Sequence, residues 1–221
     1  GTYNEREPHK FIKKENWIKI DLKNTINELK NPFSGFDIVI MCAAISSGAK
    51  NIIQKPEIFV ANNTLINQNT ITNCVNAKVK HVIFPSCSIM YQSSKNIQDE
   101  NDVNLEKISK NYIGGASMKL YAEGLCKFYS SRSNTKFSVL RHTNCIGPYD
   151  KFNPALSHVF ASVIMKTNTK KETVEVWGDG SEGRDFLYIT DLINLIKTLI
   201  TNQKDSFELL CAGSSKIIKI K

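Results

Sequence analysis

The sequence predicts an α/β protein with a doubly wound, mainly parallel β-sheet. Short apolar runs, each of the length of a buried strand, recur along the 221 residues. Stretches with the apolar periodicity of helices separate them, and turn-forming Gly, Pro and Asn residues lie at the boundaries. Strands separated by helices imply right-handed crossover connections, which place helices on both faces of a parallel sheet.

In the first part of the chain we expect strand 17–21, a short helix 21–30, strand 36–44, a long helix 56–77 and strand 81–85. The run FDIVIMCAA at 36–44 is nearly all apolar, which is typical of a central parallel strand covered on both faces. Breaks at Asn31-Pro32 and Ser34-Gly35 precede it. Pro56 suits the first turn of the long helix, because proline lacks a donor that this turn would leave unused.

In the second part we expect a polar loop 86–110, helix 112–131, strand 137–141, helix 158–166, short strands 174–177 and 186–188, helix 191–201 and strand 207–211. Tyr121, Leu125 and Phe128 share one face of helix 112–131. That face either joins the core or serves an interface between subunits.

The composition favours a globular cytoplasmic protein. Hydrophobic residues make up 41% and charged residues 23% of the chain, and the chain contains no apolar run long enough to span a membrane. The net charge is +8, but the lysines are scattered, so we expect no nucleic-acid partner. The six cysteines form no CxxC pair, which argues against a metal site.

Small or polar residues follow four of the predicted strands. They are Ala43-Ala44, Ser86-Cys87-Ser88, Thr143-Asn144 and, beside the strand FLYI, Arg184. In doubly wound sheets, ligands bind beyond the carboxyl ends of the strands, and small residues allow a planar ring or a ribose to approach the backbone. We therefore expect a ligand site at this edge.

With these residues in view, nearly the whole chain resembles the extended short-chain dehydrogenase/reductases, the NAD(P)-dependent epimerases and dehydratases of nucleotide sugars. The resemblance rests on the segments DIVIMCAA, SCSIMY, GPYDKFNPALSHVF and WGDGSEGRDFLYITDL, on Asn63 and on Lys119. The segment 147–160 is most similar to the GDP-L-fucose synthase branch. The resemblance implies NAD or NADP as cofactor, a nucleotide-diphosphate sugar as substrate and a homodimer.

The resemblance also implies an incomplete Rossmann-like sheet with a small substrate-binding lobe. Family members begin with a strand and a GxxGxxG turn that holds the cofactor pyrophosphate, and 17–21 matches their third strand. We therefore expect a fragment that lacks this first unit and the C-terminal end, and that binds cofactor poorly by itself. Residues 1–145 would form a partial NAD(P)-binding domain, and 146–221 a partial substrate lobe interleaved with the last elements of the sheet.

Two catalytic positions depart from the family pattern. The family places a tyrosine four residues before Lys119, where its phenol acts as acid and base, but this chain has Gly115. Tyr112 would replace it only if Gly114-Gly115 bends the chain and the helix starts later. Cys87 stands where the family has Ser or Thr, and a thiol is a weaker hydrogen-bond donor.

The resemblance assigns the remaining site residues. Ser88 or Ser86 would supply the hydroxyl that Cys87 lacks. The cofactor contacts would come from Ala43, Ala44, Asn63, Ser86, Lys119 and Asn144. The substrate contacts would come from Asn144, His158, Lys166, Trp177 and Arg184.

Among the substrate residues, His158 would donate a proton during epimerisation and Arg184 would bind a phosphate. The alternatives are a helix cap for His158 and a surface ion pair of Arg184 with Asp185. Lys166 is either a second phosphate contact or a solvated lysine. His142 stands where the family often has proline, so we expect a different backbone there.

The best specific expectation is an epimerase/reductase of a 4-keto sugar nucleotide, similar to GDP-L-fucose synthase. The alternatives are a 4,6-dehydratase or a 4-epimerase. A protein that binds a dinucleotide or a sugar nucleotide without catalysis is also open, because of Gly115 and Cys87.

Overall fold

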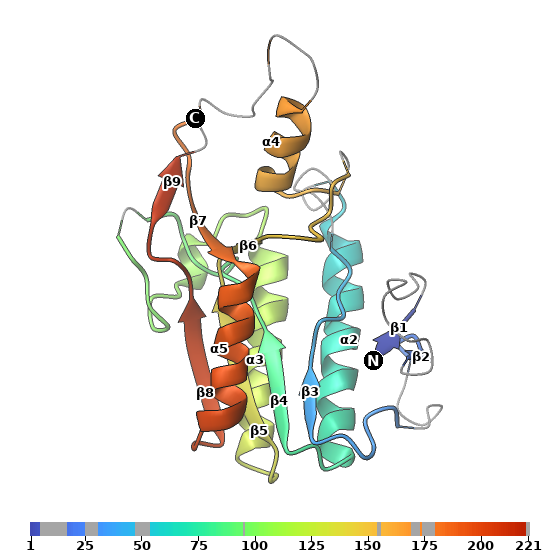
Figure 1. Ribbon diagram of the computed structural model, residues 1–221. Helices are drawn as coiled ribbons and strands as arrows, with labels where there is room; N and C mark the ends of the chain where they lie inside the picture. The colour runs from blue at the N-terminus through green and yellow to red at the C-terminus, as the bar shows by residue number, and fades with distance from the viewer. Residues whose placement is uncertain are drawn as a thin grey trace.

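The computed structural model describes residues 1–4, 17–24, 31–46, 54–94, 96–153, 156–168, 173 and 180–219. Its centre is a parallel four-stranded sheet in the order β3-β4-β5-β8 (Figure 1). These strands are β3 Ile38–Ile40, β4 His81–Pro85, β5 Lys136–His142 and β8 Phe207–Ala212. The sheet confirms the predicted α/β class.

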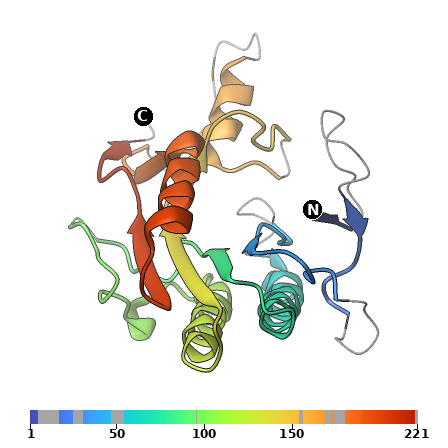
Figure 2. The same cartoon turned by 60° about the horizontal axis from the view of Figure 1, so that its bottom comes forward.

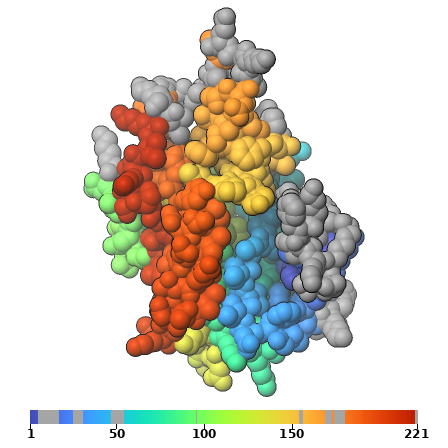
Figure 3. Space-filling view, viewed as in Figure 1, coloured from blue at the N-terminus to red at the C-terminus, as the bar shows by residue number. Residues whose placement is uncertain are grey.

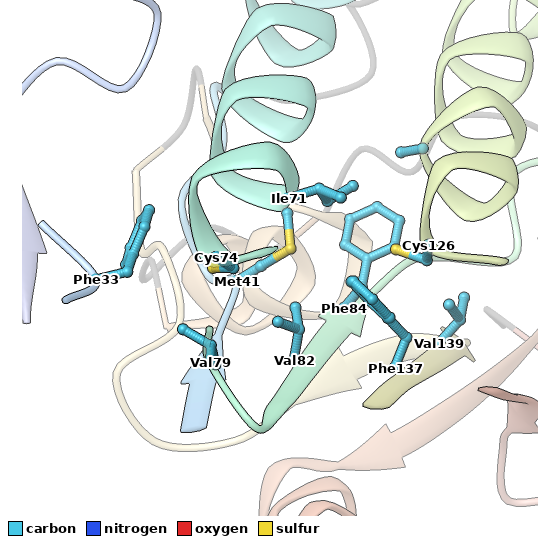
Figure 4. Close-up of a cluster of buried hydrophobic side chains, with 11 residues drawn as sticks. Phe33, Met41, Ile71, Cys74, Val79, Val82, Phe84, Cys126, Phe137 and Val139 are labelled. Carbon is cyan, nitrogen blue, oxygen red and sulfur yellow. The ribbon is translucent and has the colours of Figure 1, made fainter. Parts of the chain in front are cut away.

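Helices cover both faces of this sheet and form three layers (Figure 2). Helices α2 Pro56–Asn76 and α3 Ile113–Ser130 lie on one face, and α5 Ile189–Asn202 lies on the other. Between the sheet and the first two helices lies a cluster of buried side chains (Figure 4), which includes Met41, Ile71, Cys74, Val82, Phe84, Cys126, Phe137 and Val139. On the α5 side, Ile83 and Leu140 pack against Leu192, Ile196 and Leu199.

The strand expected at 36–44 is shorter and less covered than the sequence suggests. Only Ile38–Ile40 is paired, and β3 is the edge strand of the four-stranded sheet. Val39 packs on the α2 side, but Ile38 and Ile40 are 39% and 44% exposed. The apolar pattern predicted cover on both faces, and the described residues provide it on one.

A smaller unit lies beyond the carboxyl ends of the core strands. It contains β6 Asn144–Ile146, β7 Gly183–Tyr188, β9 Ile217–Lys219 and helix α4 Val159–Thr167 (Figure 1). Strand β7 pairs in parallel with β6 and antiparallel with β9. In the space-filling view, α4 lies above α5 at the top of the molecule (Figure 3). The expected division of the chain at residue 145 stays a prediction.

The remaining elements agree with the sequence in part. A short parallel pair, β1 Thr2–Tyr3 and β2 Ile18–Lys19, matches the start of the expected strand 17–21. The loop 86–110 contains one short 3-10 turn at Leu105–Lys107. Residues 21–24 form a turn, and most of the expected helix 21–30 and all of strand 174–177 lie outside the described residues. No described helix has the length and apolar character needed to cross a membrane.

Candidate active site

The carboxyl ends of the core strands form one edge, where most of the predicted site residues lie. Ala43 and Ala44 follow β3 and are exposed. Residues 86–88 follow β4, and His142 is the last residue of β5. Strand β4 pairs with β5 through Pro85 and Leu140, so these strand ends are direct neighbours.

Lys119 extends from α3 to this edge. Its Nζ donates a hydrogen bond to the carbonyl oxygen of Pro85 at 3.2 Å and lies 4.7 Å from the centre of the Phe84 ring. Burial lowers the pKa of the Lys119 ammonium, while the nearby Cys87 and Glu123 oppose that shift. Within the described ranges, no carboxylate lies within ion-pair distance of this ammonium.

The serines and the cysteine after β4 face different surroundings. Burial raises the pKa of the Cys87 thiol, and the Lys119 ammonium opposes the shift. The buried Ser86 hydroxyl donates to Glu123 Oε1 at 2.6 Å, so it faces α3 and is occupied there. Ser88 is half-buried, and its carbonyl accepts from the Tyr91 amide at 3.1 Å.

A buried ion pair lies under the strand ends. Arg141 Nη2 is 2.7 Å from Glu123 Oε2, and each side chain is 6% exposed. Arg141 also donates through Nη1 to the Tyr91 hydroxyl and to the Glu100 carbonyl, both at 2.9 Å. The Glu100 carboxylate accepts from the Cys211 amide of β8 at 2.6 Å. This network joins the 86–104 loop to β5, α3 and β8.

The structure contradicts the condition under which Tyr112 would replace the catalytic tyrosine. Helix α3 begins at Ile113 and runs through Gly114 and Gly115, so the helix does not start later. Tyr112 lies just before the helix and packs with the buried cluster that contains Met90, Ile108 and Ala116. Lys119 follows Tyr112 by seven positions, which corresponds to about 10 Å along a helix axis. A Cβ added at Gly115 would lie 3.2 Å from Ile89 Cδ1, so the isoleucine fills part of the room beside this glycine.

His142 is a site residue that the sequence indicated only as a backbone difference. It is half-buried, and its Nδ1 lies 2.8 Å from the Thr143 carbonyl oxygen. Burial lowers the pKa of this imidazole, the hydrogen bond with the Thr143 carbonyl opposes the shift, and the positive charge of Lys119 adds to it. The signal in the sequence was a titratable side chain at the end of a buried strand.

Both predicted asparagines have their amides engaged by the backbone. Asn63 Oδ1 accepts from the Ile45 amide at 2.8 Å, and its Nδ2 donates to the Ile45 carbonyl at 2.9 Å. It therefore fixes the loop that carries Ala43 and Ala44. Asn144 Nδ2 donates to the Asp185 carbonyl at 3.0 Å and joins β6 to β7.

The predicted substrate residues lie in the smaller unit. His158 is exposed at the N-terminal boundary of α4, and its side chain makes no capping bond. Lys166 lies in the last turn of α4 and is half-buried. Arg184 is exposed and donates to the Gly183 carbonyl at 2.8 Å. Trp177 lies outside the described residues.

The Asp185 carboxylate accepts hydrogen bonds from the segment 214–215 and does not pair with its neighbour Arg184. Its carboxylate accepts from the Ser214 amide at 2.9 Å, the Ser214 hydroxyl at 2.7 Å and the Ser215 amide at 3.0 Å. Among the described residues, Asp185 forms no ion pair with Arg184, which was the alternative prediction for this arginine. The Arg184 guanidinium is therefore not neutralised by Asp185.

A pocket of about 170 Å³ lies beside the loop after β6. Cys145, residues 146–150 and Ile189 line it. Gly147 in this loop has φ +150, and an added Cβ would lie 2.5 Å from Ile189 Cγ2. The glycine thus allows the GPYD segment to pass close to α5.

The model of the NAD dependent epimerase/dehydratase family matches residues 1–210 of the chain. The chain belongs to this family. Among relatives, dTDP-4-dehydro-6-deoxy-D-allose reductase of Streptomyces sp is 26% identical over 186 residues, covering 82% of this chain and 55% of the relative. GDP-L-colitose synthase of Yersinia pseudotuberculosis is 29% identical over 190 residues, covering 83% and 61%. The chain thus spans little more than half the length of these family members.

Solved structures of other proteins show the same fold. UDP-N-acetylglucosamine 4-epimerase from Methanobrevibacter ruminantium M1, in complex with UDP-N-acetylmuramic acid, has a TM-score of 0.76 and 22% identity, covering 92% of this chain and 63% of that protein. MoeE5 in complex with UDP-glucuronic acid and NAD has a TM-score of 0.75 and 24% identity, covering 92% and 64%. The predicted family and fold are confirmed.

The residues present fit the nicotinamide-ribose part of the family cofactor. Lys119 has three donor hydrogens, and within the described ranges the Pro85 carbonyl is the acceptor that faces them. A ribose hydroxyl would accept another. Exposed Ala43 and Ala44 leave room beside the backbone at the neighbouring strand end.

Proposed function

We propose that the protein containing this chain is an NAD(P)-dependent epimerase/reductase of a 4-keto sugar nucleotide, similar to GDP-L-fucose synthase. The observation that carries the proposal is the Lys119 ammonium. It is partly desolvated, has no carboxylate partner in the described ranges and lies beside Cys87 and His142 at the ligand-binding edge. The names of several relatives, which are reductases or synthases of dTDP- or GDP-linked sugars, support the substrate class.

In this proposal the core edge holds the cofactor. When bound, the nicotinamide supplies or takes a hydride at the sugar ring. Lys119 would bind the ribose, and Ala43, Ala44 and Asn144 would contact the nicotinamide. Asn63 would contribute by fixing the loop after β3. Ser86 contributes only through its backbone, because its hydroxyl is bound to Glu123.

The smaller unit would bind the sugar nucleotide. Arg184 and Lys166 would bind phosphate oxygens, since a guanidinium fork and an ammonium both suit a diphosphate. His158 would transfer a proton during epimerisation, and Trp177 would contact the substrate. Cys87 or Ser88 would donate a hydrogen bond to the sugar oxygen.

A binding protein without catalysis is the second candidate. The specific observations that favour it are the glycine at position 115 and the packing of the half-buried Tyr112 against a separate apolar cluster. Both leave the site without the phenol that the family pattern requires. A 4,6-dehydratase or a 4-epimerase is a third candidate, on the strength of the epimerase and dehydratase folds that match.

The test uses the full-length protein with NADH or NADPH and a panel of 4-keto sugar nucleotides. Loss of absorbance at the reduced-nicotinamide band supports the reductase. Tight cofactor binding without turnover supports the binding protein, and a 4-keto product from a hydroxy sugar without net cofactor use supports the dehydratase. Lys119→Met is expected to lower turnover at least about 100-fold. Lys127→Met, on an exposed position of the same helix, is the matched control and is expected to retain activity.

We also propose a homodimer that packs through α2 and α3. Tyr121 and Phe128 of α3 are 48% and 53% exposed, and Leu65 of α2 is 45% exposed. Leu125 packs against the core, so the apolar face predicted for this helix is divided between the two roles. Sedimentation of Phe128→Glu should show monomers, whereas a wild-type protein that sediments as a monomer contradicts the proposal.

A further inference from the structure

The imidazole of His142 is held in one tautomer at the carboxyl end of β5. Its Nδ1 lies 2.8 Å from the Thr143 carbonyl oxygen, which only accepts hydrogen bonds. Nδ1 therefore carries the proton, and Nε2 carries a lone pair. Within the described residues, no hydrogen bond occupies Nε2, so this nitrogen is available to a ligand.

The sheet register brings His142 to the edge where Lys119 and Cys87 lie. Pro85, the last residue of β4, pairs with Leu140 of β5, two residues before His142, and Cys87 follows two residues after Pro85. The Lys119 ammonium is close enough to influence the pKa of both the Cys87 thiol and the His142 ring. The same ammonium binds the Pro85 carbonyl.

The surroundings favour the neutral form of His142. Burial lowers the pKa of its ring, the hydrogen bond with the Thr143 carbonyl opposes that shift, and the positive charge of Lys119 adds to it. Other titratable groups nearby are the Cys87 thiol after β4, the Cys145 thiol of β6, whose Sγ is 3.4 Å from Nδ1, and Asp185 of β7, which accepts a hydrogen bond of 3.4 Å from the Thr143 hydroxyl. A neutral imidazole with a free Nε2 suits a general base.

We propose that His142 exchanges a proton with the C4 oxygen of the sugar, in the role that a tyrosine four residues before Lys119 would otherwise take. This inference rests on the proposed function. In the oxidative direction, the sugar O–H bond breaks and its proton moves to Nε2, giving an imidazolium. The C4–H bond breaks at the same time, its electron pair leaves as hydride to an oxidised nicotinamide, and a C4 carbonyl forms. Reduction is the reverse, and the imidazolium returns the proton.

The first experiment reads the ring itself and needs neither cofactor nor substrate. The chain has four histidines, so nitrogen NMR of the labelled full-length protein, compared with His142→Gln, identifies the His142 signals. We expect the Nδ1–H tautomer at pH 7.5. We also expect a titration midpoint below the ordinary 6.5 that rises when Lys119 becomes methionine. A ring protonated on Nε2 at pH 7.5, or a midpoint that Lys119→Met leaves unchanged, overturns the proposal.

The second experiment measures turnover in the full-length protein. His142→Gln is expected to lower kcat at least about 100-fold while KM and cofactor affinity change less than about threefold. His81→Gln removes an imidazole at the amino end of β4 and controls for general effects, with melting temperatures recorded for both variants. A folded His142→Gln variant that retains kcat overturns the role of His142 while the proposed function stands. A folded wild-type protein with no turnover on any substrate overturns both.

Discussion

Removing Arg141 should destabilise the fold, because it leaves the charge of Glu123 buried and unpaired in the core. We expect Arg141→Met to lower the free energy of unfolding by about 3–5 kcal/mol, the usual result of deleting one partner of a buried ion pair. Glu123 would lose bonds of 2.7 Å from Nη2 and 3.1 Å from Nε and keep only the Ser86 hydroxyl. The Tyr91 hydroxyl and the Glu100 carbonyl would lose their donor as well.

Urea unfolding followed by circular dichroism measures this loss of stability. Two further variants test whether the loss comes from the unpaired charge. Glu123→Met combined with Arg141→Met removes both charges and should recover most of the loss, because apolar side chains often replace a buried pair without penalty. Lys80→Met breaks an exposed pair with Asp37, whose side chains are 79% and 70% exposed, and should cost less than about 1 kcal/mol.

Two results would refute the reasoning on the buried pair. One is an Arg141→Met variant that is no less stable than Lys80→Met. The other is a double variant, Glu123→Met with Arg141→Met, whose loss in the free energy of unfolding equals the sum of the losses of the two single variants. Two residues that form an ion pair should instead show a coupling energy in this double-mutant cycle.

Three further predictions concern the site and its pH dependence. Asn63→Ala removes both amide bonds to Ile45, so it should cost about 1–3 kcal/mol in urea unfolding and weaken cofactor binding in a titration; unchanged binding contradicts the role of the loop. Burial lowers the pKa of both His81 and His142, so the unfolded chain binds more protons below about pH 6.5. The free energy of unfolding should therefore decrease as the pH is lowered from 7.5 to 5, and His81→Gln should reduce the slope of this decrease. An increase as the pH is lowered would contradict the lowered pKa values of the two histidines. Arg184→Gln should keep the melting temperature and weaken sugar-nucleotide binding about tenfold by calorimetry; equal affinity removes Arg184 from the phosphate site.

The core elements were predictable because burial leaves a pattern in the chain. The run HVIFP at His81–Pro85 was found with the correct bounds, since four of its five residues are fully buried. Helix α3 was found to within one residue at each end from its apolar face. By contrast, β6 and β9 have three residues each, which is too short for any periodicity to appear.

The sequence predicted which elements carry the candidate site residues, but not the use of each side chain. The strand ends followed from the order of the elements, and Lys119 followed from the resemblance to the family. The hydroxyl of Ser86 and the amide of Asn63 turned out to be engaged by Glu123 and Ile45, and only three-dimensional contacts reveal such occupancy. His142 was overlooked as chemistry because a lone histidine in a strand gives no sign of which groups lie around it.

The attachment of Glu100 to β8 restricts the movement of the loop that carries Glu100 relative to the sheet. Its carbonyl is held by Arg141 and its carboxylate by the Cys211 amide, so the described part of the 86–104 segment is latched to the sheet at two strands. Moving this segment away from the sheet would require breaking the contact of the buried Arg141 guanidinium with the Glu100 carbonyl.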